Sequence, residues 1–333
     1  MIGYYAHHHG SGHVTRATSI AAALHNPVTI LSSRPRPDDC DVEWLDLPLD
    51  VDDDENDYTD PTMSGTAHWA PTGVAGLTAR MAAIARWVET ARPQVVVVDV
   101  SAEVALFVRL LGVDVVVMAM PGVRDDEPHT TAYRIASRII APWSQSVYDP
   151  AWLHPYAEST TYVGVISRFD GRLRTTAPDA DHVVVLGGAG GTSFATTDVA
   201  RAADANPDYR WTAAGIDRAS WVSDVWPLLC SAAVVVTHAG QNSIADITAA
   251  RVSAIVIPHP RPFAEQDETA HSLERAGAAV VVSGWPQPDE WPKLLDAATG
   301  LDVDAWTQLR QPGAAARAAE ILDGIADRRT APR

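Results

Sequence analysis

The sequence has 333 residues and a formal net charge of −17, from 42 acidic and 25 basic residues. The length predicts about two domains, and an apolar share of 47% allows a sizeable core. An acidic chain with a single lysine, Lys293, lacks the basic stripe of a nucleic-acid binder, so we expect no nucleic-acid partner. Cys40 and Cys230 are far apart without ligand-like neighbours, which argues against a disulfide scaffold or a zinc site.

No apolar run approaches the roughly 20 residues that span a bilayer. The opening Met1–Tyr5 lacks the basic stretch and long apolar core of a secretory signal. We therefore expect a soluble cytoplasmic protein, with peripheral membrane contact left open. His7, His8 and His9 follow an apolar strand-like opening inside a glycine motif, so we interpret them as native rather than as a tag.

The first half alternates short apolar strands with helical runs. The run Val95–Val98 is continuous and β-branched, which is typical of a strand covered on both faces. Such alternation predicts a doubly wound parallel sheet with right-handed crossovers. The acidic segment 50–60 is expected to be a solvated loop. The expected strands are 1–5, 28–31, 95–98 and 113–118, and the expected helices are 14–24, 72–91 and 102–111.

The second half restarts this alternation after a break around 164–181. We therefore expect an α/β fold with two doubly wound Rossmann-like domains, residues 1–165 and 166–310, facing across a cleft. Residues 311–333 form a third segment with an amphipathic helix near 314–327. The expected strands of the second half are 183–186, 234–237, 255–257 and 280–282.

The strongest chemical signal follows the expected strand 234–237. Gly240 lets the backbone approach a ligand closely, and a helix is expected to start near Asn242 and Ser243. Free N–H groups and the positive end of the helix dipole make such a start a natural phosphate site, where His238 would add a side-chain donor. Asp246, one turn further, could accept hydrogen bonds from a ribose diol. A helix cap with core packing and no ligand is the alternative interpretation.

Two further glycine patterns follow strands. The turn 187–191 would let backbone amides face a phosphate, so Gly188 and Gly190 are candidate contacts, although many α/β turns are equally glycine-rich. The pattern Gly10-Ser11-Gly12-His13 follows the first strand, and Arg16 stands one turn later. Gly12 and Arg16 are candidates to face an acceptor or a phosphate, and a surface ion pair is the equal alternative for Arg16.

The segment Trp221–Gly277 resembles the donor-binding region of the two-domain (GT-B) glycosyltransferases. It is similar both to the bacterial peptidoglycan N-acetylglucosaminyltransferases (family 28) and to the plant-type UDP-glycosyltransferases (family 1). The plant-type pattern has a tryptophan near its start, His-x-Gly-x-Asn-Ser in the middle, an acidic residue three positions on, and Asp-Gln near its end. The matching residues here are Trp221, His238, Gly240, Asn242, Ser243, Asp246, Glu265 and Gln266.

The resemblance implies an inverting, metal-independent transferase. It would move a hexosyl or N-acetylhexosaminyl group from a nucleotide-diphosphate sugar to an acceptor hydroxyl. We expect the sugar to be UDP-linked and no further cofactor to be needed. It also implies that the helix of residues 311–333 crosses back to the first domain. The implied donor contacts are His238, Asn242 and Ser243 for the diphosphate, Asp246 for the ribose, Glu265 and Gln266 for the sugar, and Trp221 and Val222 for the base.

This sequence departs from the family pattern in ways that leave the sugar open. Asp246 is one methylene shorter than the usual glutamate, and Glu265 stands where aspartate or glutamine is usual. Position 241 is glutamine where the plant family has tryptophan. The run Asp52–Asp54 lies in an acid-rich loop, so we do not expect it to hold a metal.

Sugar transfer with inversion needs a base for the acceptor hydroxyl, and an imidazole with a pKa near 6.5 suits that task. His13 is the candidate base, because Gly-x-Gly-His at this position also resembles the same families. Asp99, at the end of a buried strand, is the candidate carboxylate that orients the ring. The alternatives are a loop-shaping His13 and an Asp99 that caps the next helix.

Two other functions stay open at this point. The first is a nucleotide-sugar 2-epimerase on the same fold, which needs no acceptor. The second is a non-catalytic nucleotide-sugar-binding protein. The acceptor is unreadable from the sequence, so a lipid-linked sugar, a polymer and a small molecule are all possible partners.

Overall fold

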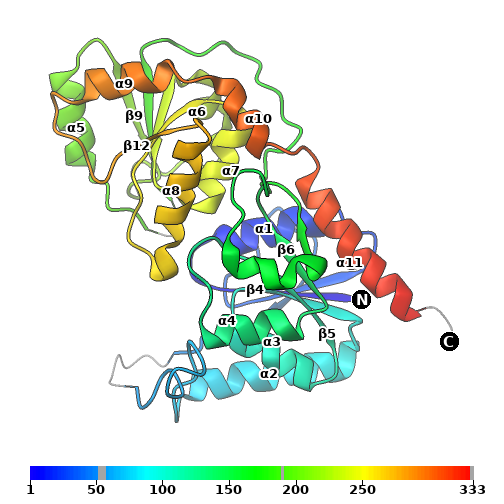
Figure 1. Ribbon diagram of the computed structural model, residues 1–333. Coiled ribbons are helices and arrows are strands. Elements are labelled where there is room, and N and C mark those ends of the chain that lie inside the picture. The colour runs from blue at the N-terminus through cyan, green and yellow to red at the C-terminus, as the bar shows by residue number, and fades with distance from the viewer. Residues whose placement is uncertain (52–57, 189–190, 331–333) are drawn as a thin grey trace.

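The computed structural model describes residues 1–51, 58–188 and 191–330. Figure 1 shows two lobes, each built on a parallel sheet with helices on both faces. This confirms the predicted α/β class with two doubly wound units. Among the described residues, no helix combines the length and the apolar character needed to cross a membrane.

The first lobe holds a seven-stranded parallel sheet in the order β3-β2-β1-β4-β5-β6-β7. The order reverses between β1 and β4, where Tyr5 pairs with Val98 and Ala6 with Asp99. Ligands bind beyond the carboxyl ends of strands at such a switch point. The strands are β1 (Ile2–Ala6), β2 (Val28–Ser32), β3 (Glu43–Asp46), β4 (Val95–Asp99), β5 (Asp114–Met118), β6 (Arg138–Ala141) and β7 (Thr160–Tyr162). The helices are α1 (Gly12–Ala21), α2 (Ala75–Ala91), α3 (Ala102–Leu110), α4 (Glu127–Ile135) and the 3₁₀ segment η1 (Ala151–Ser159).

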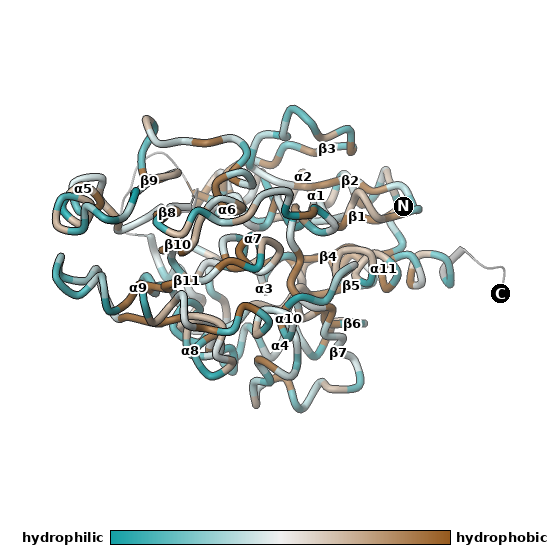
Figure 2. The backbone as a smooth tube through the Cα atoms, turned by 90° about the horizontal axis from the view of Figure 1, so that it is seen from above, coloured by the Kyte–Doolittle hydropathy of each residue, from teal (hydrophilic) through white to brown (hydrophobic). Residues whose placement is uncertain are grey.

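The second lobe holds a five-stranded parallel sheet in the order β12-β11-β10-β8-β9, with its switch point between β8 and β10. Figure 2 shows the apolar stretches of chain running through the two sheets. The strands are β8 (His182–Leu186), β9 (Arg210–Ala214), β10 (Val234–Thr237), β11 (Ser253–Val256) and β12 (Val280–Val281). The helices are α5 (Thr196–Ala205), α6 (Trp226–Ser231), α7 (Gln241–Ala250), η2 (Pro262–Ala264), α8 (Glu265–Arg275), α9 (Trp291–Thr299), η3 (Val303–Ala305), α10 (Trp306–Leu309) and α11 (Ala314–Thr330).

Helix α11 leaves the second lobe and packs on the first, against α1 and β4 (Figure 1). Its small and apolar face joins the core of the first lobe, where Ala318 and Leu322 are fully buried. Asp323 accepts hydrogen bonds from the backbone N–H groups of His25 and Asn26, which fixes the turn after α1. The helix therefore braces the element that presents Gly12 and His13.

The sequence missed four strands: β3, β6, β7 and β9. Three of them lie at sheet edges, where one side of the strand is solvated and the apolar pattern is weak. β3 reads Glu-Trp-Leu-Asp and β7 reads Thr-Thr-Tyr. The central strands are continuous valine-rich runs because both of their faces are covered.

Replacing Leu322 by alanine should lower the free energy of unfolding by about 2–5 kcal/mol, because it empties a buried site between α11 and the first sheet. Leu110→Ala is the matched control, since Leu110 is 75% exposed and its loss should cost under about 0.5 kcal/mol. Urea denaturation measures both. Equal losses in the two variants would contradict the packing of α11 on the first lobe.

Candidate active site

A cavity of about 1120 Å³ lies between the two lobes, at the carboxyl ends of both sheets. The loops after β1, β4 and β5 line it from the first lobe. The loops after β8, β10 and β11 line it from the second lobe. Both switch points therefore open into one space.

Two helix starts face each other in this cavity. Helix α1 begins at Gly12, and α7 begins at Gln241 after the N-cap Gly240. A Cβ atom at Gly12 would lie 3.6 Å from Asn242 Oδ1, which is ordinary contact distance, so the two helix starts are close neighbours. The first-turn N–H groups of α7 have no intrahelical acceptor, and neither a side-chain cap nor an acidic first-turn residue compensates them. The two positive helix ends thus meet at one point.

His13 and Asp99 lie together beside these helix starts. His13 Nδ1 is 2.8 Å from Asp99 Oδ1, and the ring lines the cavity. A proton on Nδ1 donates to this carboxylate, which leaves Nε2 as the acceptor. The Asp99 carboxylate therefore favours the tautomer of His13 that carries its proton on Nδ1.

Asp99 is fully buried and accepts four hydrogen bonds. Arg16 donates from Nε at 2.8 Å and from Nη2 at 2.7 Å, and Tyr4 donates its hydroxyl at 2.9 Å. Burial opposes ionisation of Asp99, but Arg16 and His13 outweigh it and hold its pKa below the usual range. Asp99 is consequently an anion that orients His13, and it does not cap α3, whose N-cap is Ser101.

The backbone directly after Asp99 is strained. Val100 has φ 65° and Ser101 has φ 139°, and a positive φ is unusual for a β-branched residue. The Ser101 hydroxyl accepts from the N–H of Val104 and so holds the start of α3 in this conformation. Strain of this kind accumulates where a site fixes the geometry of its side chains.

Arg16 differs from both sequence interpretations. It is 4% exposed, so it is neither a surface ion pair nor a free cation facing a phosphate. Besides its two bonds to Asp99, its Nη1 donates to Gln241 Oε1 at 2.8 Å. Arg16 thus joins the His13–Asp99 pair of the first lobe to the start of α7 in the second.

His238 lines the cavity, but both of its ring nitrogens bind protein atoms. Nδ1 lies 2.7 Å from the carbonyl of Ile257, and Nε2 accepts from the N–H of Ser193 at 3.2 Å. Nε2 is also 3.0 Å from Thr192 Oγ1. The sequence interpretation of His238 as a side-chain donor to a diphosphate therefore does not fit this arrangement. The ring instead holds the loop after β8 against the loop after β10.

Glu265 and Gln266 open helix α8 at the cavity wall. Gln266 Oε1 accepts from the N–H groups of Ala239 and His259, at 3.1 and 2.9 Å. These bonds fix the start of α8 beside the start of α7. Gly188, Asn242 and Ser243 also line the cavity, and Gly190 lies outside the described residues.

Three predicted donor contacts are not brought into the cavity. Trp221 is 61% exposed, and Val222 packs against the core of the second lobe. Asp246 is buried and accepts from Ser167 Oγ and from Arg168. Burial raises the pKa of Asp246 to about 6, against the opposing effect of Arg168. As the lobes stand here, Asp246 supports the segment that links them.

The sequence analysis missed a cluster on the opposite wall. Asp126 Oδ2 lies 3.0 Å from His68 Nε2, and Asp126 Oδ1 lies 2.7 Å from His129 Nδ1. Arg124 lies beside His129, and Phe263 of the second lobe packs on both histidines. The sequence signal that could have revealed this cluster is the run of polar residues within 124–129, which follows strand β5.

Two groups of described side chains bring possible metal ligands together: His7, His8 and Asp50, and His68, Asp126 and His129. An arginine contacts a possible ligand atom in each group. Arg80 Nη1 lies 2.7 Å from Asp50 Oδ2, and Arg124 Nη1 lies 3.1 Å from His129 Nε2. A resident guanidinium charge opposes the binding of a divalent cation at both places.

Comparisons with known proteins give a family domain and a fold. Residues 202–291 match the glycosyltransferase family 28 C-terminal domain. No curated protein matches the sequence. Among solved structures, the chain resembles the glycotransferase of kitacinnamycin (14% identity, 98% of each chain covered, TM-score 0.69). It also resembles MurG of Acinetobacter baumannii (14% identity, 97% of this chain and 99% of that one, TM-score 0.64). CalG4, the calicheamicin glycosyltransferase, is a third likeness (17% identity, 99% of each chain, TM-score 0.65).

At these identities the solved structures show a shared fold, and the family domain adds the enzyme class. The chain is a glycosyltransferase with the GT-B fold, and it resembles the family 28 enzymes in its second half. The expectations about fold class and enzyme class are thereby confirmed.

Acid should lower the free energy of unfolding because of His129. Burial and the charge of Arg124 lower the pKa of His129 to about 4, from 6.5 in the unfolded chain. The unfolded chain binds the extra proton first, so stability is full above pH 6.5 and falls as the pH drops toward 4. This one group accounts for about 3 kcal/mol.

His129→Gln keeps a donor and an acceptor but cannot titrate. Urea denaturation at pH 7 and pH 4.5 should show a smaller loss of stability on acidification in this variant than in the wild type. The same loss in both proteins would contradict the neutral state assigned to His129.

Proposed function

We propose that this glycosyltransferase moves a hexosyl or N-acetylhexosaminyl group, with inversion and without a metal, from a UDP-linked sugar to an acceptor hydroxyl. The observation that carries the proposal is the position of the His13–Asp99 pair. His13 lines the cavity beside the open start of helix α7, and Asp99 holds the His13 ring there.

The start of α7 supplies the donor diphosphate site. Backbone N–H groups of its first turn and the positive end of its dipole suit an anion, and the side chains of Asn242 and Ser243 stand beside them. Gly188, after β8, supplies backbone on the facing side. His238 contributes by holding the Thr192–Ser193 loop in place.

Deprotonation of the acceptor falls to His13. Its Nε2 takes the hydroxyl proton while the acceptor oxygen attacks the anomeric carbon from the face opposite the leaving group. The bond from that carbon to the phosphate oxygen breaks, and its electron pair leaves with UDP. Asp99 stabilises the imidazolium that forms, and its four hydrogen bonds keep it ionised.

The leaving diphosphate needs positive charge in the transition state. Fixed N–H groups at two helix starts provide it without reorganisation. The arginines in the two histidine–aspartate clusters argue against a divalent ion there. These features support metal-independent transfer.

The acceptor side of the cavity favours an acceptor without a negative charge. Within the described residues, each arginine that the first lobe gives to the cavity pairs with a carboxylate: Arg16 with Asp99, Arg80 with Asp50, and Arg124 with Glu265. Apolar side chains of α2, α3 and β5 line the remaining wall, namely Leu77, Met81, Val104, Val117 and Met118. A negatively charged acceptor would lack an unpaired arginine on this wall.

Two rival functions differ in what they need from His13. An epimerase or a nucleotide-sugar-binding protein has no acceptor to deprotonate. Incubation of UDP-N-acetylglucosamine with the protein alone tests the epimerase, because a 2-epimer would appear without an acceptor. Binding of UDP with no turnover on any acceptor would favour the binding protein.

His13→Ala should lower kcat by about 100- to 10,000-fold, because it removes the base while leaving the donor site intact. The affinity for UDP, measured by calorimetry, should stay within about twofold of wild type. His154→Ala is the matched control, since His154 is an exposed histidine 3.4 Å from Asp149. Unchanged turnover in the His13 variant would remove His13 as the base.

A further inference from the structure

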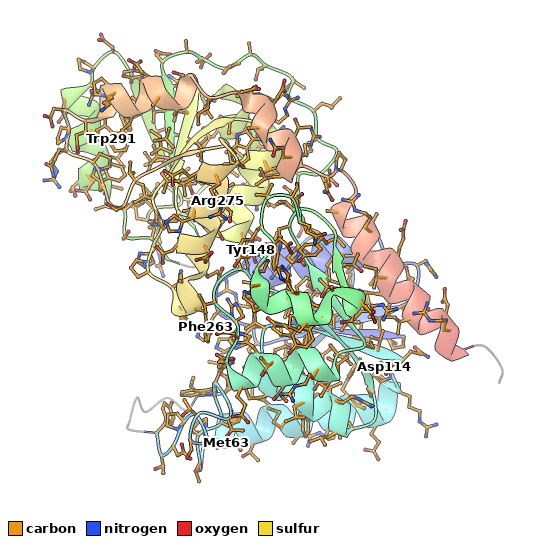
Figure 3. All side chains as sticks on the ribbon, in the orientation of Figure 1. Met63, Asp114, Tyr148, Phe263, Arg275 and Trp291 are labelled. Carbon is orange, nitrogen blue, oxygen red and sulfur yellow. The ribbon has the colours of Figure 1, made fainter. Side chains whose placement is uncertain are left out.

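Segment 261–266 of the second lobe contacts the first lobe. It runs from the loop after β11 into the start of α8. Figure 3 labels Phe263 at this junction. Phe263 and Ala264 have φ values of 62° and 52°, so two successive non-glycine residues adopt the left-handed conformation. Each costs on the order of 1–2 kcal/mol unless contacts compensate it. Those contacts come from the other lobe.

The first lobe holds this segment in a socket formed by Gly122, Val123, Arg124, His68 and His129. The N–H of Val123 donates to the carbonyl oxygen of Phe263 at 2.8 Å. Gly122 makes the approach possible, because a side chain there would begin 2.4 Å from the same oxygen. Tyr148 and Trp152 hydrogen-bond the carbonyl of Gly122 and hold the socket loop in place.

The Phe263 ring fills the socket. The Arg124 guanidinium lies over its face, 4.8 Å from the ring centre. The rings of His129 and His68 meet it edge-on, with centres 4.8 and 5.1 Å away. Cation–π and edge contacts of this kind stabilise a buried aromatic ring beyond the apolar area it buries.

Arg124 also joins the socket to Glu265. Its Nε donates to the carbonyl of Pro121 at 3.0 Å, its Nη1 lies 3.1 Å from His129 Nε2, and its Nη2 lies 3.5 Å from Glu265 Oε2. Arg124 is 4% exposed, so its charge depends on a nearby carboxylate. Separation of the lobes would take Glu265 away and leave that charge in the first lobe.

Glu265 is therefore held from two directions. The next residue, Gln266, ties the start of α8 to the start of α7 through Ala239. Arg124 holds the carboxylate itself from across the cavity. The cavity wall at Glu265 is consequently built by both lobes.

We propose that Arg124 is a positioning residue for the donor sugar: with Phe263 docked in its socket, Arg124 fixes the carboxylate of Glu265, and the sugar site is complete only when the lobes are closed. The inference rests on the proposed function, which gives Glu265 the sugar hydroxyls. The nucleotide site at α7 lies within the second lobe and does not need Arg124. Sugar recognition and nucleotide recognition should therefore separate in variants of the socket.

Arg124→Met should raise KM for the UDP-sugar about tenfold, the effect of one lost charge-assisted contact, while the Kd for UDP changes less than twofold. Arg124→Lys keeps the charge and should recover part of the loss. Phe263→Ala, at a half-buried position, removes the docking ring without touching Glu265 and should act like Arg124→Met. Arg210→Met removes an exposed ion pair inside the second lobe and is the matched control.

A double-mutant cycle tests whether Arg124 acts through Glu265. Arg124→Met combined with Glu265→Gln should be no worse than the more severe single variant, because both remove the same contact. Small-angle scattering with UDP bound should give a larger radius of gyration for Arg124→Met and Phe263→Ala than for wild type.

Three results would overturn the inference: an unchanged KM in Arg124→Met, an equal loss of affinity for UDP and the UDP-sugar, or multiplicative effects in the double variant. The wild type separates this failure from failure of the proposed function. A wild-type protein that neither binds nor turns over UDP-sugars refutes the function. An active wild type with an unaffected Arg124→Met refutes only the positioning role.

Discussion

The apposition of two helix starts, α1 from one lobe and α7 from the other, is the constraint on which the remaining structure depends. Both ends carry partial positive charge, so bringing them together without an anion is unfavourable. In the structure a polar contact links the two helix starts instead, because Arg16 of α1 donates to Gln241 of α7. An anion placed between the helix starts would neutralise both.

The buried Asp99 connects the two helix starts to His13, the proposed base. A carboxylate with no exposure is tolerated because Arg16, Tyr4 and His13 satisfy it. Arg16 therefore serves two purposes, since it keeps the Asp99 carboxylate ionised and contacts the second lobe at Gln241. The strain at Val100 is the local cost of ending β4 at this carboxylate. Helix α11 adds rigidity from behind, since it packs on α1 beneath His13.

The sequence was informative where a residue's surroundings are set by its own strand and helix. Valine-rich central strands, glycine turns at their ends and the His13 pattern all depend on local structure, and β4 pairing with β1 was enough to bring Asp99 near His13. The rest depends on how the lobes dock. Neither the backbone conformation of Phe263 nor the partnership of Arg124 with Glu265 leaves a local signal. His238 and Asp246 carry the residue types of a ligand site, yet in this structure other protein groups occupy their polar atoms.

A structure of the protein with UDP bound would test the central claim most directly. The β-phosphate should lie between the lobes and accept hydrogen bonds from the backbone N–H groups of Gln241, Asn242 or Ser243, with His13 Nε2 facing the same space. A phosphate bound elsewhere, or a start of α7 sealed by side chains in that complex, would contradict it.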